Sequence, residues 1–139
     1  MKKLSVVSLF LSFAIGSLAG CGPSFVPVEG KVIVSGQPLN TGSVAFYPTA
    51  GSGQADAEIG TGDIGSDGSY KLMSSGKAGM PPGKYKVVVN ASKPSNPDDQ
   101  YSLPILLVDK KFTDLATTPL VVDVAAGAGA GKYDLNVTK

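Results

Sequence analysis

Short apolar stretches that alternate with period two, broken repeatedly by glycine and proline, constrain this chain more than any other feature. Such alternation is typical of half-buried strands, whereas an amphipathic helix repeats its apolar residues every three to four positions. The 18 glycines and 10 prolines lie between the stretches rather than in one tract. No long helix is predicted after residue 20. Seven strands are predicted, at residues 28–34, 43–47, 57–61, 70–72, 84–90, 120–124 and 132–138.

Seven short strands with frequent turn signals predict an all-β chain folded as an antiparallel β-sandwich. Two of the turns are Ser35-Gly36-Gln37-Pro38 and Ser66-Asp67-Gly68-Ser69, where Asp-Gly supplies the positive φ of a tight turn. At about 1.5–3 kcal/mol per fully buried large apolar side chain, one core stabilises such a domain without disulfides. The predicted inward residues are Val28, Val32, Val34, Val44, Phe46, Tyr70, Leu72, Tyr85, Val87, Val89, Leu120, Val122, Val124, Tyr133, Leu135 and Val137.

The first twenty residues have the pattern of a secretory signal peptide. Lys2 and Lys3 precede an apolar run over residues 4–15, and small residues follow it. The run is too short to span roughly 30 Å of hydrocarbon, which takes about 20 residues. The ending Leu18-Ala19-Gly20-Cys21 resembles the lipobox of bacterial lipoproteins, in which the cysteine receives lipid and becomes the first mature residue. The resemblance implies that Cys21 is the lipid-attachment residue.

Cys21 is the only cysteine, so no internal disulfide can form, and its place between two glycines disfavours a buried thiol. Mature lipoproteins carry two or three acyl chains, which hold a protein stably at a bilayer. The expected location is a bacterial cell envelope membrane. In the best-known lipoprotein sorting rule, aspartate directly after the lipid-bearing cysteine marks the inner membrane. Residue 22 is glycine, which favours the outer membrane. The predicted division is a signal peptide at 1–20, an acylated cysteine and short tether at 21–27, and one sandwich domain at 28–139.

The composition argues against several function classes. The chain has no histidine, no arginine and no tryptophan, and its formal net charge is +1. Without histidine, serine triads, cysteine–histidine dyads and zinc-hydrolase motifs are each incomplete. Without a basic, arginine-bearing face, nucleic-acid binding is not expected. A hydrolase that uses two carboxylates is a distant alternative. We therefore expect a non-enzymatic protein with no cofactor and no metal.

Two glycine-containing patterns resemble ligand loops only superficially. Gly127-Ala128-Gly129-Ala130-Gly131-Lys132 lacks the first glycine and the final Ser/Thr of a phosphate-binding loop, and it joins two predicted strands. We interpret it as the loop of a hairpin, and expect no nucleotide. Asp63 and Asp67 lie at a turn without the further oxygen ligands that calcium needs. The acidic pair Asp98-Asp99 is interpreted as a solvated loop tip.

Several segments resemble carboxypeptidase regulatory-like domains. The likeness is clearest over residues 28–90 and looser over 110–138, through a segment that contains Phe112 and a final hairpin. It implies a transthyretin-like (prealbumin-like) Greek-key fold of seven strands, placed behind a lipobox as in many short bacterial lipoproteins. The segments that carry the likeness are Val28-Glu29-Gly30-Lys31-Val32, Gly36-Gln37-Pro38-Leu39, Gly42-Ser43-Val44-Ala45-Phe46, Asp67-Gly68-Ser69-Tyr70-Lys71-Leu72 and Pro82-Gly83-Lys84-Tyr85-Lys86-Val87-Val88-Val89.

Two kinds of enzyme are associated with the families that these segments resemble, and neither activity is expected for this chain. The transthyretin-like hydrolase of 5-hydroxyisourate is implied to need histidines, an arginine and a C-terminal Tyr-Arg-Gly-Ser. This chain has neither residue type and ends Asn136-Val137-Thr138-Lys139. Metallocarboxypeptidases hold zinc in a separate catalytic domain, which these segments do not resemble.

The connection over residues 91–119 is long for a compact domain, and long connections are often functional. It contains an apolar run at residues 105–108. One interpretation is that the run folds back and covers a sheet edge or the open end of the sandwich. The other is that the connection contacts another envelope protein or a glycan. The candidate contact residues are Tyr101, Ile105, Leu106 and Leu107.

The expected function is therefore that of a membrane-anchored module that binds or supports another envelope component. The alternative is a carbohydrate- or cell-wall-binding module. Such sites usually stack sugars on aromatic rings, and Tyr47 and Tyr101 are the tyrosines that the predicted core does not use.

Overall fold

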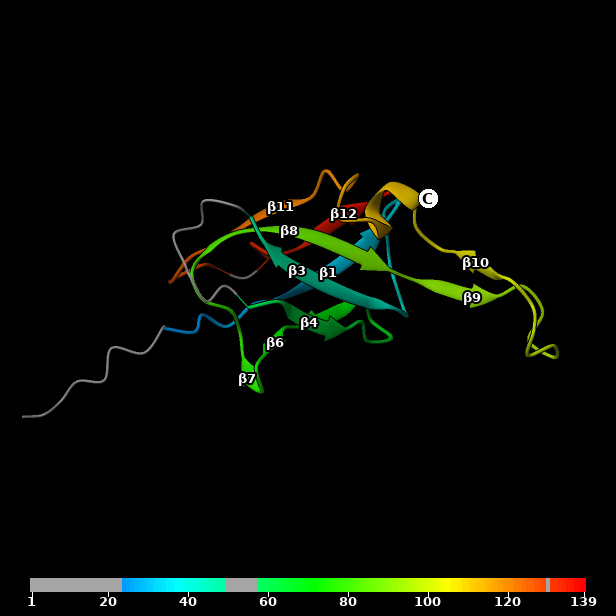
Figure 1. The fold of residues 1–139 in the computed structure, drawn as a ribbon, viewed down its shortest axis with the longest axis horizontal. Coiled ribbons are helices and arrows are strands. Elements are labelled where there is room, and N and C mark those ends of the chain that lie inside the picture. The colour runs from blue at the N-terminus through cyan, green and yellow to red at the C-terminus, as the bar shows by residue number, and fades with distance from the viewer. Residues whose placement is uncertain (1–23, 50–57, 130) are drawn as a thin grey trace, which may run out of the picture.

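The computed structural model describes residues 24–49, 58–129 and 131–139, and these ranges are built from strands (Figure 1). They contain no α-helix, and their one helical turn is the 3-10 segment η1 (Lys110–Thr113). The all-β prediction is confirmed. The strands are β1 (Glu29–Val34), β2 (Gln37–Pro38), β3 (Ser43–Pro48), β4 (Gly60–Asp63), β5 (Ser69–Lys71), β6 (Met73–Ser74), β7 (Lys77–Ala78), β8 (Gly83–Asn90), β9 (Ser92–Pro94), β10 (Pro104–Leu106), β11 (Val121–Val124) and β12 (Leu135–Val137).

The larger sheet has the strand order β11-β8-β3-β4-β6-β7. Its centre is the pairing of β3 with β8, in which Val44 lies opposite Val89 and Phe46 lies opposite Val87. These four side chains are buried, because paired residues of neighbouring strands point to the same face. All ladders of this sheet are antiparallel.

The second sheet has the order β12-β1-β2, and β5 also pairs with β1. β2 and β5 run antiparallel to β1, whereas β12 runs parallel to it, with Val32 opposite Leu135 and Val34 opposite Val137. The prediction of a purely antiparallel sandwich is wrong at this pair. Parallel neighbours need a long connection, and here nearly the whole domain lies between the two strands.

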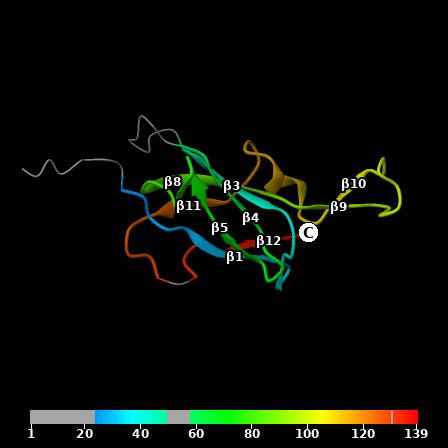
Figure 2. The same cartoon turned by 90° about the horizontal axis from the view of Figure 1, so that it is seen from below.

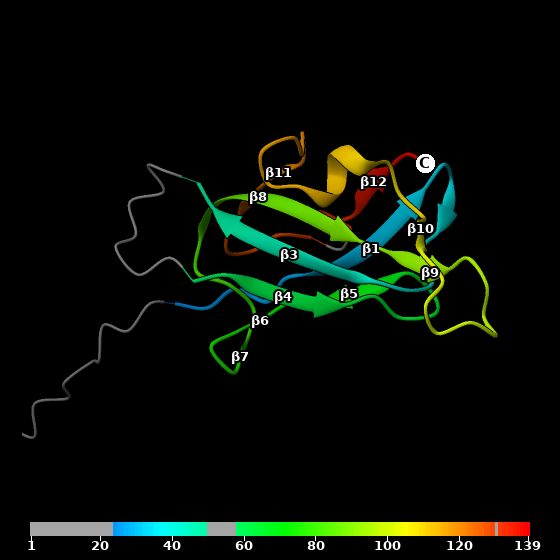
Figure 3. The ribbon, with the colours of Figure 1, turned by 45° about the vertical axis from the view of Figure 1, so that its right-hand side comes forward.

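The two sheets enclose one hydrophobic core, and Figures 2 and 3 show the two layers from other sides. Phe46 of β3 packs against Tyr70 of β5 and against Tyr85 of β8, with ring centroids 6.3 Å apart in each pair. The predicted inward residues are buried, except that Val34, Leu120 and Val122 are partly buried against the core. The architecture is therefore two packed β-layers, as in a sandwich.

Two turns lie where the sequence predicts them. Ser35 and Gly36 have φ of 48° and 88° and join β1 to β2. Gly68 has φ of 83°, and Asp67 braces its turn by accepting hydrogen bonds from the backbone N–H and the hydroxyl of Ser69. This second turn joins strands of different sheets, because β4 pairs with β3 and β5 pairs with β1. It carries the chain from one layer to the other.

The predicted final hairpin is wrong. β11 pairs with β8 and β12 pairs with β1, so the glycine-rich segment between them crosses from one sheet to the other. Its residue Ala130 lies outside the described residues. The hydroxyl of buried Tyr133 accepts a hydrogen bond from the N–H of Ala125 and donates one to the Ala125 carbonyl, which ties the two ends of the crossing together.

Six of the seven predicted strands correspond to β1, β3, β5, β8, β11 and β12. The predicted strand at 57–61 overlaps β4 only at residues 60 and 61, and its first residue, Ala57, lies outside the described residues. The described chain adds five short strands. Of these, β2 extends the turn after β1. β6 and β7 form a small hairpin between β5 and β8. β9 and β10 lie in the long connection and pair with each other.

Candidate functional site

Cys21, the predicted lipid-attachment residue, lies outside the described residues. The described chain begins at Ser24, and it is first fixed to the domain at Val26. The backbone of Val26 exchanges two hydrogen bonds with that of Met80, of 2.8 and 2.9 Å. Next to it, the ammonium of Lys77 lies 5.1 Å from the ring centroid of Phe25, within the range of a cation–π contact. The domain therefore holds the chain five residues after Cys21.

The predicted contact residues lie on a hairpin that leaves one end of the sandwich. After β8, the carbonyl of buried Ala91 accepts a hydrogen bond from the N–H of Leu107, and β9 and β10 continue as an antiparallel pair beyond the core. Figures 1 and 2 show this pair and its tip projecting from the end opposite to the one where the chain enters at residue 24. We call residues 92–106 the arm.

The tip of the arm is braced by its own polar groups. The N–H of Ser95 donates to the carbonyl of Leu103 at 3.2 Å, and the hydroxyl of Ser102 donates to the carbonyl of Asn96 at 3.0 Å. The carboxylate of Asp99 accepts a hydrogen bond from the N–H of Tyr101 at 2.9 Å. These bonds stay within the arm, so its hairpin shape does not depend on contact with the sheets.

Large apolar side chains of the arm are exposed to solvent. The exposed fractions are 85% for Tyr101, 80% for Leu103, 43% for Ile105 and 40% for Leu106. Three of these residues are among the predicted contacts, and Leu103 is an addition. Its position next to Pro104, outside any alternating pattern, gave no signal that it faces solvent.

Both faces of the arm carry apolar side chains. The register places Lys93 opposite Ile105, and Leu103 shares this face because side chains alternate along a strand. Pro104 and Leu106 point to the other face. Neither strand of the arm pairs with any other strand of the described chain. The arm is therefore a two-stranded ribbon with apolar groups exposed on both sides.

The apolar run at residues 105–108 divides between the arm and the core. Val108 is buried in the core, and Leu107 packs against it. Ile105 and Leu106 remain on the arm. The structure thus brings Tyr101 and these two residues onto one projecting element, and leaves Leu107 at its base.

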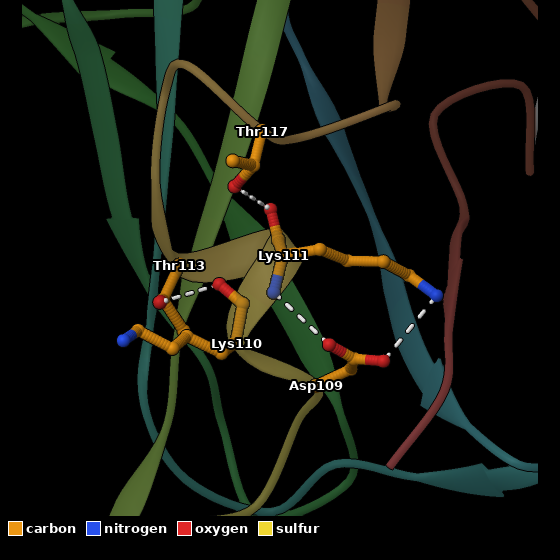
Figure 4. Close-up of polar contacts among 5 residues, drawn as sticks. All are labelled: Asp109, Lys110, Lys111, Thr113 and Thr117. Carbon is orange, nitrogen blue, oxygen red and sulfur yellow. Dashed lines mark hydrogen bonds and ion pairs between the residues drawn. The ribbon is translucent and has the colours of Figure 1, made fainter.

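A capped helical turn fixes the chain just after the arm (Figure 4). Asp109 precedes η1, accepts a hydrogen bond from the N–H of Lys111 at 3.0 Å and pairs with its ammonium at 3.4 Å. The backbone hydrogen bond is the main cause that lowers the pKa of Asp109. Phe112 is buried in the core, and the hydroxyl of Thr117 donates to the carbonyl of Lys111 at 2.9 Å. The turn anchors the return of the arm to the sandwich.

A hollow of about 480 Å³ opens beside the base of the arm. Apolar side chains from β1, from the turn region after it and from the end of the arm contribute to its lining, together with the last residue of the chain. The apolar lining residues are Val34, Pro38, Leu39 and Leu107, and the polar ones are Ser35, Gln37, Asn40 and Lys139.

The two tyrosines outside the predicted core lie at opposite ends of the domain. Ser43, at the beginning of β3, pairs with Asn90, where the arm begins, whereas Tyr47 pairs with Lys86 toward the other end of β8. Tyr101 lies beyond Asn90, at the tip of the arm. Tyr47 and Tyr101 therefore do not form one stacking surface for a sugar.

Buried polar side chains in the described part of the chain have structural partners. The hydroxyl of Ser74 donates to the carboxylate of Glu58 at 2.9 Å, and that of Thr118 donates to the carbonyl of Val87 at 2.6 Å. No buried side-chain oxygen or nitrogen of these residues lacks a hydrogen bond. Within the same ranges, no three side chains of metal-ligating type gather.

Tyr70 is the most strongly perturbed titratable group among the described residues. Its hydroxyl donates to the carbonyl of Tyr133, which comes from the segment leading to β12. Burial raises the pKa of Tyr70 well above its usual range, and the nearby charge of Asp134 adds to the effect. The bond joins two elements of the core, so the raised pKa has a structural origin.

The residues described by the structure include no helix that is long and apolar enough to cross a bilayer. In comparisons with known proteins, no family model, no curated protein and no solved structure matches this chain.

Proposed function

We propose that this chain is a lipid-anchored, non-enzymatic lipoprotein of a bacterial cell envelope, and that it acts as a binding or structural module. The observation that carries the proposal is the sequence Leu18-Ala19-Gly20-Cys21, which follows a basic start and an apolar run too short to span a bilayer. Two or three acyl chains at Cys21 anchor a protein permanently, whereas a single chain does not.

The short tether keeps the domain close to its membrane. Four residues lie between Cys21 and Val26, which pairs with Met80. At about 3.3–3.6 Å per residue, an extended chain spans roughly 17–18 Å over the five steps from Cys21 to Val26. A partner in the same membrane is therefore favoured over a distant one. Gly22 supports placement in the outer membrane.

The arm is the surface that we assign to the partner. It exposes Tyr101, Leu103, Ile105 and Leu106 at the end of the domain opposite to the tether (Figure 1). Interface centres are enriched in aromatic side chains and depleted in charged ones, and a few well-packed anchors dominate binding. A protein partner is favoured over a glycan because Tyr101 is the only aromatic residue of the arm.

The finer architecture of the domain belongs to the same proposal. A transthyretin-like Greek-key fold of the carboxypeptidase regulatory-like kind is supported by the segments that resemble that family. It is also supported by the correspondence of six of the seven predicted strands to strands that enclose one core.

Metabolic labelling tests the anchor. Cells that produce the whole chain are grown with radiolabelled palmitate, and the protein is recovered from detergent-extracted membranes. The native chain should be labelled, and a Cys21→Ser variant should be neither labelled nor retained in the membrane fraction. Ser24→Thr, which leaves the lipobox intact, is the matched control and should label normally. Equal labelling of the Cys21→Ser variant would refute the anchor.

A further inference from the structure

The tip of the arm is acidic. Asp98 and Asp99 are both exposed there, and no lysine occurs between residues 94 and 109. Asp99 is held in place by its bond to the N–H of Tyr101, which fixes the acidic pair beside the exposed aromatic ring. The tip therefore presents negative charge next to one large aromatic side chain.

The base of the arm is basic. Lys93 lies on β9 near the sandwich, and Lys110 follows the return of the chain to the core. Both lysines are exposed, whereas Asp109 is already paired with Lys111. The arm thus has opposite charges at its two ends.

The middle of the arm is apolar and uncovered. A two-stranded ribbon with no third strand or helix against it is marginally stable in water. Leu103 and Ile105 lie on one face and are exposed. Leu103 lies midway between the acidic tip and the basic base, and Ile105 lies opposite Lys93. An occupant that covers this face must present apolar groups at its centre, positive charge toward the tip and negative charge toward the base.

A second copy of the arm has these features in this order when it lies antiparallel to the first. We propose that two copies of this chain associate through their arms about a twofold axis that passes near Leu103. Asp98 and Asp99 of each copy then face Lys93 and Lys110 of the other, and the apolar faces meet in the middle. A twofold interface is self-complementary, so both contacts form twice and the assembly closes as a dimer.

The hollow at the base of the arm strengthens this arrangement. In an antiparallel pair, the tip of one arm reaches the base of the other. The hollow there is lined by the apolar residues Val34, Pro38 and Leu39 together with the polar residues Ser35, Gln37 and Asn40. Tyr101 of the second copy is the large side chain placed to enter it.

The arms meet through their faces rather than through their strand edges. Pro94 and Pro104 lie opposite each other in the hairpin, and proline has no backbone N–H to donate to a neighbouring strand. Prolines of this kind protect edges from sheet extension. Side-chain packing and charge pairing therefore define the contact.

The dimer agrees with the proposed anchor but does not depend on it. Each arm projects from the end opposite to residue 24, so the two tethers lie at the outer ends of the pair (Figures 1 and 3). When the pair lies along a bilayer, both tethers reach the same membrane. Confinement to one surface raises the effective concentration of the copies and favours pairing.

Charge reversal tests the pairing on the full chain extracted in detergent, by sedimentation. An Asp98→Lys/Asp99→Lys variant and a Lys93→Asp/Lys110→Asp variant should each dimerise about tenfold or more weakly than the native chain, because each places like charges opposite each other. Mixed together, the two variants should form a heterodimer of near-native affinity. The chain that combines all four changes should also dimerise normally.

Cysteine crosslinking in intact cells locates the axis. Leu103→Cys should yield a disulfide-linked dimer under mild oxidation, whereas Met73→Cys, at another exposed position, on β6, should not. The native chain, whose only cysteine is Cys21, is the second control. Absence of a Leu103→Cys dimer, a crosslink to a different protein instead, or a mixture of charge variants that fails to recover would each overturn the proposal.

Discussion

At the scale of single residues, a glycine in the left-handed region fixes the point where the chain joins the domain. Gly79 has φ of 95°, and a Cβ built there would lie 2.2 Å from the carbonyl oxygen of Val26. Its neighbour Met80 makes the two backbone bonds that hold Val26. Gly76 has a similar φ of 75°, but a Cβ at this position would meet nothing within 4 Å.

This pair of glycines gives a matched prediction. Gly76→Ala should cost about 1–2 kcal/mol of unfolding free energy, the cost of a left-handed backbone for a residue with a Cβ. Gly79→Ala should cost about 3 kcal/mol or more, because the close approach to Val26 adds overpacking. Urea unfolding of the two variants measures the difference. Equal losses would show that the Val26 contact has no role in stability.

The buried Tyr70 predicts a loss of stability in alkali. Its pKa is raised in the folded state by burial, while the unfolded chain titrates near the ordinary value of about 10. Above that pH the unfolded chain releases a proton that the folded chain keeps, so the free energy of unfolding falls as pH rises. In Tyr70→Phe this fall should be shallower.

The same variant should also lose about 1–3 kcal/mol at neutral pH, because the carbonyl of Tyr133 is left without its donor. Denaturant titrations at pH 7 and above pH 10 give both quantities. Tyr101→Phe, at an exposed position, is the control and should change neither. An unaltered alkaline slope in Tyr70→Phe would contradict the assignment.

At the scale of the elements, the alternating strands could be predicted from the sequence because each has one buried face. β3 and β8 show this clearly, since Val44 and Phe46 or Tyr85, Val87 and Val89 recur every second residue and all are buried. Only local spacing is needed to recognise such a strand. The pairing of strands depends on contacts far apart in the chain. The parallel pairing of β12 and the absence of the expected final hairpin could therefore not be predicted from local spacing.

The arm could be predicted only in part, for a different reason. The connection at 91–119 and its apolar run stood out by length and composition. However, β9 and β10 are three residues long, contain prolines and show no alternation. Burial alone separates Ile105 and Leu106, on the arm, from Val108, in the core. The four consecutive apolar residues at 105–108 do not indicate by themselves which of them lie on the arm and which in the core.

The long connection has one part in the core and one part on the arm, so we expect side-chain truncations in the two parts to differ in their effect on stability. Phe112→Ala removes the buried ring of η1 and should cost about 3–5 kcal/mol of unfolding free energy. Leu103→Ala removes an exposed side chain from the arm and should change stability by less than about 0.5 kcal/mol. Thermal unfolding of dilute protein separates the two. A large loss from Leu103→Ala would mean that the arm packs on the sandwich.

At the scale of the whole molecule, the described chain enters the domain at one end and the arm projects from the other (Figure 1). Between these two ends, the rings of Phe46, Tyr70 and Tyr85 pack together in the core. The hydroxyls of Tyr70 and Tyr85 donate hydrogen bonds to backbone carbonyls of the described chain. The proposed function depends on a further feature, a lipid anchor at Cys21, which the sequence Leu18-Ala19-Gly20-Cys21 predicts.

The mass of the intact protein purified from membranes tests that central claim most directly. A chain that begins at Cys21 and carries the added mass of two or three acyl chains is the predicted result. A chain that still contains residues 1–20, or one whose Cys21 is unmodified, would contradict the account.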